Sequence, residues 1–152
     1  MRTILKTTLR SLIALGLCTF AISSALAQND FAQTAAKEPG AKVTASGLVF
    51  RSLQDGQGIS PMATDKVRVH YRGTFPDGKE FDSSYKRNQT IEFPLNGVIP
   101  CWTEGVQLMK VGGKAKLTCP PAIAYGSRGA GGVIPPNATL QFEVELVAVA
   151  GK

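Results

Sequence analysis

The sequence has few of the residues on which most catalytic chemistry depends. Its 152 residues include a single histidine, a single tryptophan and three cysteines. The lone His70 argues against a metal site, because zinc sites are usually built from several histidine or cysteine ligands. A Ser-His-Asp triad would have to use this same histidine, since the chain has no other. His70 also occupies the polar side of an alternating segment, where a surface position is the simpler interpretation. We therefore expect neither a metal nor an organic cofactor.

Several other common signatures are absent. The chain has no internal repeat and no low-complexity tract, and its glycine-rich segment over residues 129–132 is too short and wrongly placed for a phosphate-binding loop. The formal net charge is +6, and residues 1–27 contain three basic and no acidic residues, so the remainder carries +3. This modest charge gives no reason to expect nucleic acid as a partner.

No apolar run in the chain is long enough for an ordinary membrane span, which needs about 20 residues. The N-terminus instead has a basic start, an apolar stretch over residues 11–22 and the small-residue pattern Ala25-Leu26-Ala27. This pattern is typical of a secretory signal peptide ending at residue 27. A retained membrane anchor is the alternative, as is lipidation at Cys18, although Leu17 is not the small residue that usually precedes a lipidated cysteine. We expect no stable membrane span after cleavage.

The remainder of the chain divides into a lead and one domain. Residues 28–45 are rich in Ala, Gln, Thr and Lys and are interrupted by Pro39-Gly40, which predicts a flexible lead or a short, weakly ordered helix. Residues 46–150 suffice for a single domain of ordinary size.

Alternation of apolar and polar residues predicts an antiparallel sheet within that domain. The last strand is the clearest, because apolar residues fill every second position from Leu140 to Leu146. Further strands are expected over residues 47–53, 67–72, 79–82, 91–95 and 114–119.

One short helix interrupts the strands. Trp102, Val106 and Met109 fall at helical spacing, Pro100 suits a helix start, and the glycine pair at 112–113 suits its end. The predicted fold class is therefore α+β, with an antiparallel β-sheet wrapped around one short α-helix.

Four sequence blocks carry a family resemblance. They are VHYRG at residues 69–73, DGKEFDSS at 77–84, VIPCW at 98–102 and YGSRGAGGVIPPNATL at 125–140. In this order, the blocks resemble the FK506-binding (FKBP) family of peptidyl-prolyl cis-trans isomerases, from about residue 47 to 146. Because the lead is too short for the helical dimerisation domain of longer relatives, the chain resembles a secreted, single-domain bacterial relative of the macrophage infectivity potentiator-like group.

The resemblance implies a site of apolar residues with a few polar groups at its edge. It assigns the catalytic positions to Asp82, Tyr125, Trp102 and Ile99, with Trp102 as the pocket floor and the Ile99 N–H and Tyr125 hydroxyl as donors to a ligand carbonyl. It assigns substrate binding to Tyr71, Phe81, Arg87, Ile91, Phe93, Val98, Val133, Ile134 and Phe142. Arg87 matches a family arginine that can pair with Asp82. Ile91 stands where family members often have an aromatic residue.

From the residues alone, other interpretations remain open. Without the resemblance, plain core residues are the simpler interpretation of Trp102 and the wall aromatics, and a turn cap formed together with Ser83 and Ser84 is the simpler interpretation of Asp82. Cys101 and Cys119 form an even pair in a chain expected to be exported, which favours a disulfide, with two buried free thiols as the alternative.

We therefore expect a peptidyl-prolyl cis-trans isomerase that acts on X–Pro bonds in exported proteins. A non-catalytic module that binds partner proteins in the same cleft is the rival hypothesis. The expected partners are proline-containing polypeptides, with FK506- and rapamycin-class macrolides as inhibitors. The expected location is across the inner membrane, in the periplasm.

Overall fold

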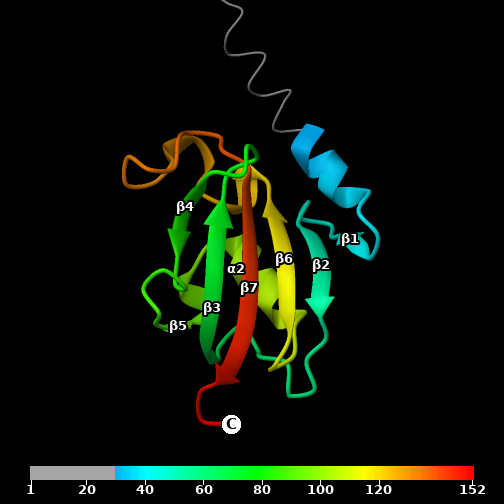
Figure 1. The fold of residues 1–152 in the computed structure, drawn as a ribbon, viewed down its shortest axis with the longest axis vertical. Helices are drawn as coiled ribbons and strands as arrows, with labels where there is room; N and C mark the ends of the chain where they lie inside the picture. The colour runs from blue at the N-terminus through cyan, green and yellow to red at the C-terminus, as the bar shows by residue number, and fades with distance from the viewer. Residues whose placement is uncertain (1–29) are drawn as a thin grey trace, which may run out of the picture.

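The structure, a computed structural model of the chain, describes residues 30–152. The expected signal peptide at 1–27 lies outside this part of the chain. Within it, one antiparallel sheet curves around a short helix (Figure 1), as the alternation predicted. No helix in residues 30–152 has the length and apolar character needed to cross a bilayer.

Seven strands make the sheet. Their bounds are β1 Ala41–Val43, β2 Val49–Gln54, β3 Lys66–Thr74, β4 Glu80–Ser83, β5 Ile91–Pro94, β6 Lys114–Cys119 and β7 Leu140–Val149. The strand order is β1-β2-β6-β7-β3-β4, with β5 pairing beside β4 on the same strand, β3. The long strands β3 and β7 pair over most of their length and form the centre of the sheet.

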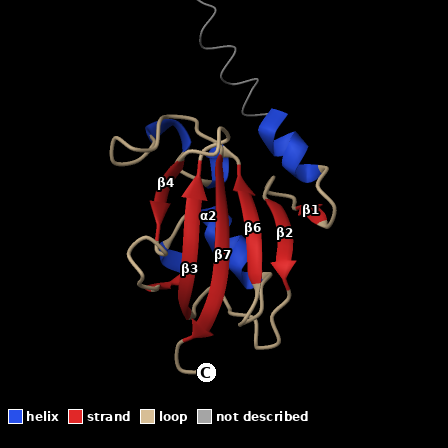
Figure 2. Ribbon diagram, viewed as in Figure 1, coloured by secondary structure: helices blue, strands red, loops and turns tan. Residues whose placement is uncertain are grey.

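Helix α2, Pro100–Gln107, packs against the concave face of the sheet (Figure 2). Pro100 occupies its first turn, where the missing N–H costs nothing. Gly105 allows a close approach, since a Cβ built there would lie 2.8 Å from the side chain of Leu117 on β6. The buried face of the helix, including Trp102 and Val106, joins a single core with the inward residues of β3, β6 and β7.

Along β7, the alternation of apolar and polar residues in the sequence matches an alternation of buried and partly exposed side chains in the structure. Leu140, Val144 and Leu146 have no exposed surface and Phe142 has 3%, while the residues between them are partly exposed. The prediction for this strand is therefore confirmed. The same pattern holds in β3, where Val67 and Val69 are fully buried.

The N-terminal part of the described chain is more structured than expected. Residues 30–36 are helical, and Ala41–Val43 form β1, which pairs with β2. The sheet therefore begins before the domain boundary expected at residue 46. The physical reason is a contact distant in sequence: Glu38 accepts hydrogen bonds from Arg51 on β2 and Lys116 on β6, and Ala35 is buried. A strand of three residues is too short to show a periodic pattern.

A second difference concerns Leu95, which was expected to end a strand. It instead begins a 3₁₀ turn, Leu95–Gly97, where its backbone N–H donates to the carbonyl of Asp65. Two further 3₁₀ turns, Pro121–Ile123 and Gly126–Arg128, follow β6 and lead into the glycine-rich loop.

A disulfide joins Cys101 on α2 to Cys119 at the end of β6. The two Cα atoms lie 5.8 Å apart, and neither residue has exposed surface. The pairing expected from the cysteine count is thus present in the structure. It attaches the first turn of the helix to the sheet, next to Trp102.

We predict that reducing this disulfide lowers the free energy of unfolding by about 3 kcal/mol, the chain-entropy value for a loop of this size. The cysteines are 18 residues apart. The measurement is urea unfolding with and without reductant, with Cys101→Ser/Cys119→Ser as a control on which reductant has no effect. Two reactive thiols per chain in denatured, unreduced protein from an oxidising compartment would contradict the prediction.

Candidate active site

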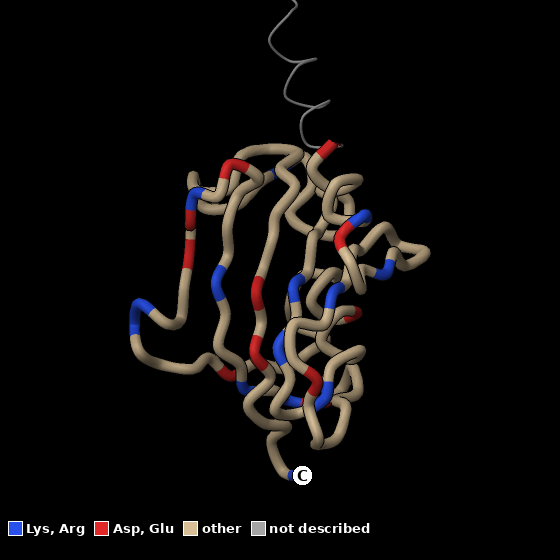
Figure 3. Tube along the Cα trace, turned by 45° about the vertical axis from the view of Figure 1, so that its right-hand side comes forward, with Lys and Arg blue, Asp and Glu red and all other residues tan. Residues whose placement is uncertain are grey.

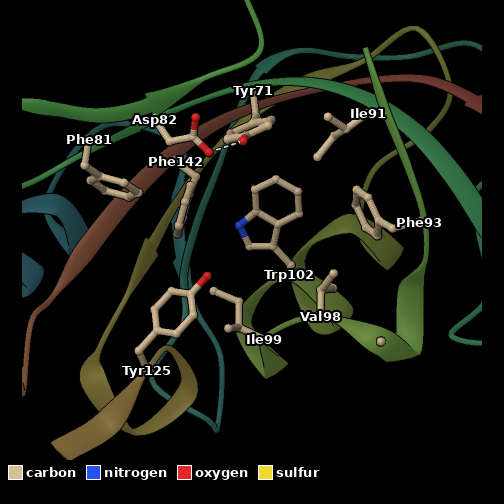
Figure 4. A pocket seen from close by; sticks show the side chains of 11 residues that line it. Tyr71, Phe81, Asp82, Ile91, Phe93, Val98, Ile99, Trp102, Tyr125 and Phe142 are labelled. Atoms are coloured by element: carbon tan, nitrogen blue, oxygen red, sulfur yellow. Dashed lines mark hydrogen bonds between the residues drawn. The ribbon is translucent and has the colours of Figure 1, made fainter. Parts of the chain in front are cut away.

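A cavity of about 520 Å³ opens at the end of the sheet where α2 begins. Its lining comes from β3, β4, β5, β7, the first turn of α2, the segment before it and the loop after β6 (Figure 4). The lining residues are Tyr71, Phe81, Asp82, Ile91, Phe93, Gly97, Val98, Ile99, Trp102, Tyr125 and Phe142.

Trp102 lies at the base of this cavity and meets aromatic rings from three strands. Its ring centroid is 5.3 Å from that of Tyr71 and 5.2 Å from that of Phe142, both in edge-to-face arrangements. Phe93 on β5 lies 5.5 Å away in a tilted contact. Such pairs add to the hydrophobic effect and fix ring orientation. The floor is therefore both core and pocket surface, so the two interpretations of Trp102 are compatible.

The indole nitrogen of Trp102 is buried without a hydrogen-bond partner in the described chain. Figure 4 shows this nitrogen on the side of the indole that faces Phe142, whose ring stands at 90° to it.

Gly73 on β3 makes room for the aromatic wall. A Cβ at this position would lie 2.5 Å from the ring of Phe81 and 3.1 Å from that of Phe142. Because glycine has no Cβ, the Phe81 ring can lie across the strand and contact Phe142 edge-to-face, with the two ring centroids 5.6 Å apart. The glycine of the VHYRG block is therefore explained by side-chain packing.

Polar groups meet at one side of the opening. Asp82 accepts hydrogen bonds from the hydroxyl of Tyr71 and from Arg87 Nη1, the latter at 2.6 Å. A second guanidinium nitrogen, Nη2, donates to the Tyr71 hydroxyl at 3.0 Å, so the three side chains form a closed ring. Burial alone would raise the pKa of Asp82, but the hydrogen bonds from Tyr71 and Arg87 outweigh it and hold that pKa below its ordinary value.

The same contacts act oppositely on the phenol. Burial and the hydrogen bond to the Asp82 carboxylate raise the pKa of Tyr71, so its proton stays on the phenol oxygen. Burial, and then the nearby charge of Asp82, likewise raise the pKa of Tyr125. The carboxylate is therefore the charged member of the group, and both phenols are neutral donors at neutral pH.

Besides the Trp102 indole N–H, two donors in the lining have no partner within the described chain. The hydroxyl of Tyr125 makes no hydrogen bond there, and Figure 4 shows it pointing into the cavity. The backbone N–H of Ile99 is likewise unbonded, whereas its carbonyl accepts from Trp102 and Thr103 at the start of α2. Both groups can donate to a carbonyl oxygen of a bound chain.

A glycine-rich flap adjoins the cavity. Residues 130 and 134 pair as an isolated bridge, and Gly129 precedes them with a φ of 63°, where a Cβ would lie 2.1 Å from the Ile134 carbonyl oxygen. The flap presents Val133, which is 55% exposed, and holds Ile134 buried at 7%. Both line a smaller hollow that shares Phe81, Asp82 and Tyr125 with the main cavity.

The sequence-derived site residues are thus largely brought together. All of the expected catalytic positions line the cavity, as do six of the nine expected binding residues: Tyr71, Phe81, Ile91, Phe93, Val98 and Phe142. Arg87 stands outside the lining but bonds two of its members, and Val133 and Ile134 lie on the flap beside it. Ile91 fills the expected aromatic position with an aliphatic side chain. Among residues 30–152, no group of three or more His, Cys, Asp or Glu side chains could hold a metal.

Sequence reasoning missed the structural role of Ser84 and His70. Ser84 is fully buried, and its hydroxyl accepts from the Tyr71 N–H at 2.8 Å and lies 2.9 Å from Nδ1 of His70. His70 stacks on Tyr85 at 4.7 Å on the outer face. Ser84 therefore ties the turn that carries Arg87 to the strand that carries Tyr71. The repeated serine after Asp82 was a visible signal, but only as a turn cap.

Comparison with known proteins agrees with the family resemblance of the sequence blocks. A family profile described as FKBP-type peptidyl-prolyl cis-trans isomerase matches residues 57–147. The FKBP-type 22 kDa peptidyl-prolyl cis-trans isomerase of Escherichia coli (strain K12) is 54% identical over 114 residues, which cover 75% of this chain and 55% of that protein. The chain spans about half the length of the curated relatives it matches.

Solved structures are similar as well. FkpA from Escherichia coli superposes with a TM-score of 0.80 and 47% identity, covering 85% of this chain and 60% of that one. A peptidyl-prolyl cis-trans isomerase from Pseudomonas syringae pv. tomato superposes with a TM-score of 0.79 and 39% identity, covering 88% of this chain and 98% of that one. The α+β architecture is therefore shared along nearly the whole described chain.

We predict that Arg87→Ala raises the pKa of Asp82, because it removes one of the hydrogen bonds that lower it. The stabilisation due to the lowered pKa is present above the unfolded value, about 3.9, and disappears as pH falls through the folded value. The variant should therefore be less stable than the parent near neutral pH, and the difference should vanish in strong acid.

The measurement is the carboxyl carbon chemical shift of Asp82 as a function of pH. Arg72→Ala is the matched control, since Arg72 pairs with Glu80 and not with Asp82. An unchanged Asp82 midpoint in Arg87→Ala would show that the ion pair has no influence on this carboxylate.

Proposed function

The chain belongs to the FKBP-type peptidyl-prolyl cis-trans isomerase family, and we propose that it accelerates rotation about X–Pro bonds in exported polypeptides. The observation that carries this proposal is the cavity itself. Its base is a buried tryptophan ringed by aromatic side chains, and two unbonded donors, the Tyr125 hydroxyl and the Ile99 N–H, stand in its lining. A proline ring fits such a surface, and the adjacent carbonyl can accept from the donors.

The reaction needs no covalent step. The barrier to rotation is about 18–20 kcal/mol, because the planar amide is stabilised by resonance that the twisted amide loses. The planar amide is more polar than the twisted one, so an apolar cavity that replaces water with aromatic rings disfavours the planar forms relative to the transition state. Selective binding of the twisted amide is then sufficient for catalysis.

Each polar residue has a distinct part in this scheme. The Tyr125 hydroxyl and the Ile99 N–H hold carbonyl oxygens of the bound chain, and so fix one side of the rotating bond. Asp82, kept ionised by Tyr71 and Arg87, places a negative charge at the edge of the cavity. The flap residues Val133 and Ile134 cover apolar side chains that flank the proline.

The proposed location is the periplasm. The sequence of residues 1–27 has the composition of a signal peptide, and the Cys101–Cys119 disulfide suits an oxidising compartment. Proline-containing polypeptides that fold after export are then the substrates.

We predict that the chain from residue 28 accelerates cis-to-trans isomerisation in a protease-coupled assay on a proline tetrapeptide. Tyr125→Phe removes one donor to the bound chain, and Asp82→Asn removes the negative charge at the cavity edge. Each should lower kcat/KM about tenfold, which corresponds to a loss of about 1.4 kcal/mol of transition-state stabilisation. The unfolding curve of Tyr125→Phe should remain close to the parent's, because its hydroxyl makes no hydrogen bond within the described chain. Asp82→Asn loses the charged pairing with Arg87, so it should remain folded but be less stable than the parent near neutral pH.

The control is Asp77→Asn, which removes a carboxylate from the β3–β4 turn outside the cavity. A parent protein without activity, yet able to bind the peptide, would favour the rival hypothesis of a non-catalytic binding module. Full activity in both edge variants would show that shape and desolvation are sufficient.

A rapamycin-class macrolide should bind the same cavity and inhibit turnover. Trp102 is the only tryptophan and lies at the base of the cavity, so its fluorescence reports occupancy directly. We expect weaker binding than in aromatic-walled relatives because of Ile91, and Ile91→Phe should strengthen it. If saturating macrolide alters neither emission nor activity, the ligand does not occupy this cavity.

A further inference from the structure

A second cavity lies at the other end of α2. It has a volume of about 410 Å³ and is formed between the inward side of β2 and the residues that end the helix. Buried Phe50, Met109 and Ala115 contribute apolar surface to it, and Leu108 adds a side chain that is 52% exposed. This cavity, called the α2–β2 groove below, shares no lining residue with the cavity above Trp102, which is called the proline cavity below.

The cations of this groove differ from Arg51 on β2 and Lys116 on β6, which are ion-paired. Acidic and basic residues lie on neighbouring strands of the sheet (Figure 3), and Arg51 and Lys116 both pair with Glu38. Lys42 and Lys110, which line the groove, are exposed and have no ion pair or hydrogen bond from their ammonium groups within the described chain. Two uncompensated cations therefore border an apolar depression.

The other charged groups of the groove do not cancel these cations. Asp55 is the one acidic residue in the lining, and its single negative charge offsets at most one of the lysines that line the groove. Lys114 adds a third cation, but its ammonium lies 5.7 Å from the ring centroid of Tyr85 and 4.0 Å from Glu143 on the outer face. The groove thus has an excess of positive charge, complementary to an acidic ligand.

The adjoining strand edge is open. Strand β1 pairs with β2 only opposite residues 49–51, so Ser52, Leu53 and Gln54 have no strand beside them on that side within the described chain. An extended polypeptide can add to such an edge through its backbone, while its alternate side chains enter a neighbouring hollow.

We infer that the α2–β2 groove binds an extended polypeptide segment in which apolar side chains are flanked by carboxylates. The apolar side chains contact Phe50, Leu108 and Met109, and the carboxylates meet Lys42 and Lys110. The eight residues of α2 rise by about 12 Å, a distance that an extended chain covers in roughly four residues. One unfolded chain can therefore occupy this groove and the proline cavity together, which raises the local concentration of its prolines.

The test uses a proline-free nonapeptide with leucine, valine and phenylalanine at its centre and glutamates on both sides. Added to ¹⁵N-labelled protein from residue 28, it should shift the amide resonances of β2 and of residues 108–115 and leave those of the proline cavity unchanged. A second peptide with lysine in place of every glutamate should bind at least tenfold more weakly.

Charge reversal separates this groove from general electrostatic attraction. Lys42→Glu/Lys110→Glu should weaken binding of the acidic peptide at least tenfold, whereas Lys37→Glu/Lys79→Glu, with the same change in net charge away from the groove, should leave it near the parent value. Turnover of a proline tetrapeptide should be unchanged in Lys42→Glu/Lys110→Glu, so the result does not depend on the proposed isomerase activity.

Three outcomes would overturn the inference. They are no binding of the acidic peptide, equal binding of the lysine peptide, or shifts confined to the proline cavity. Equal weakening in the two charge-reversal variants would likewise show that the peptide responds to overall charge and not to Lys42 and Lys110.

Discussion

The close packing of α2 against the sheet is the interaction on which the site depends. Gly105 allows the helix to approach Leu117, and the Cys101–Cys119 disulfide fixes the first turn to β6. Trp102 is then held between Tyr71, Phe93 and Phe142, which belong to three different strands. A shift of the helix would break these ring contacts together, so the geometry of the cavity floor is as rigid as the core.

The polar groups of the site are separated from this floor. This separation keeps the free-energy cost of desolvating them low. Asp82 is partly exposed at the cavity edge, where water and Arg87 both stabilise its charge. Tyr71 connects the two regions, because its ring packs against Trp102 while its hydroxyl bonds Asp82. An apolar interior with one ionised residue at its rim follows from this arrangement.

The sequence predicted those elements in which burial repeats at a fixed period. Strands β3, β6 and β7 and helix α2 were found in this way, since their inward residues recur at the strand or helix spacing. Strand β1 was missed because three residues show no period, and its position depends on Glu38 meeting Arg51 and Lys116. The cavity residues came from the family resemblance: Phe81 and Phe142 are apolar strand residues like any others, and only folding shows that Gly73 makes space for both.

If the chain acts as proposed, catalysis limits how tightly the cavity can bind the planar X–Pro bond of its substrate. Tight binding of the planar X–Pro bond would stabilise the ground state as well as the transition state and would not raise kcat. Affinity for an unfolded chain therefore has to come from contacts away from the rotating bond. The two ends of α2 satisfy this requirement separately: the end at Trp102 faces an aromatic cavity, and the end at Leu108 faces a groove bordered by unpaired lysines. A single short helix, fixed to the sheet at Cys101, can thus position both surfaces.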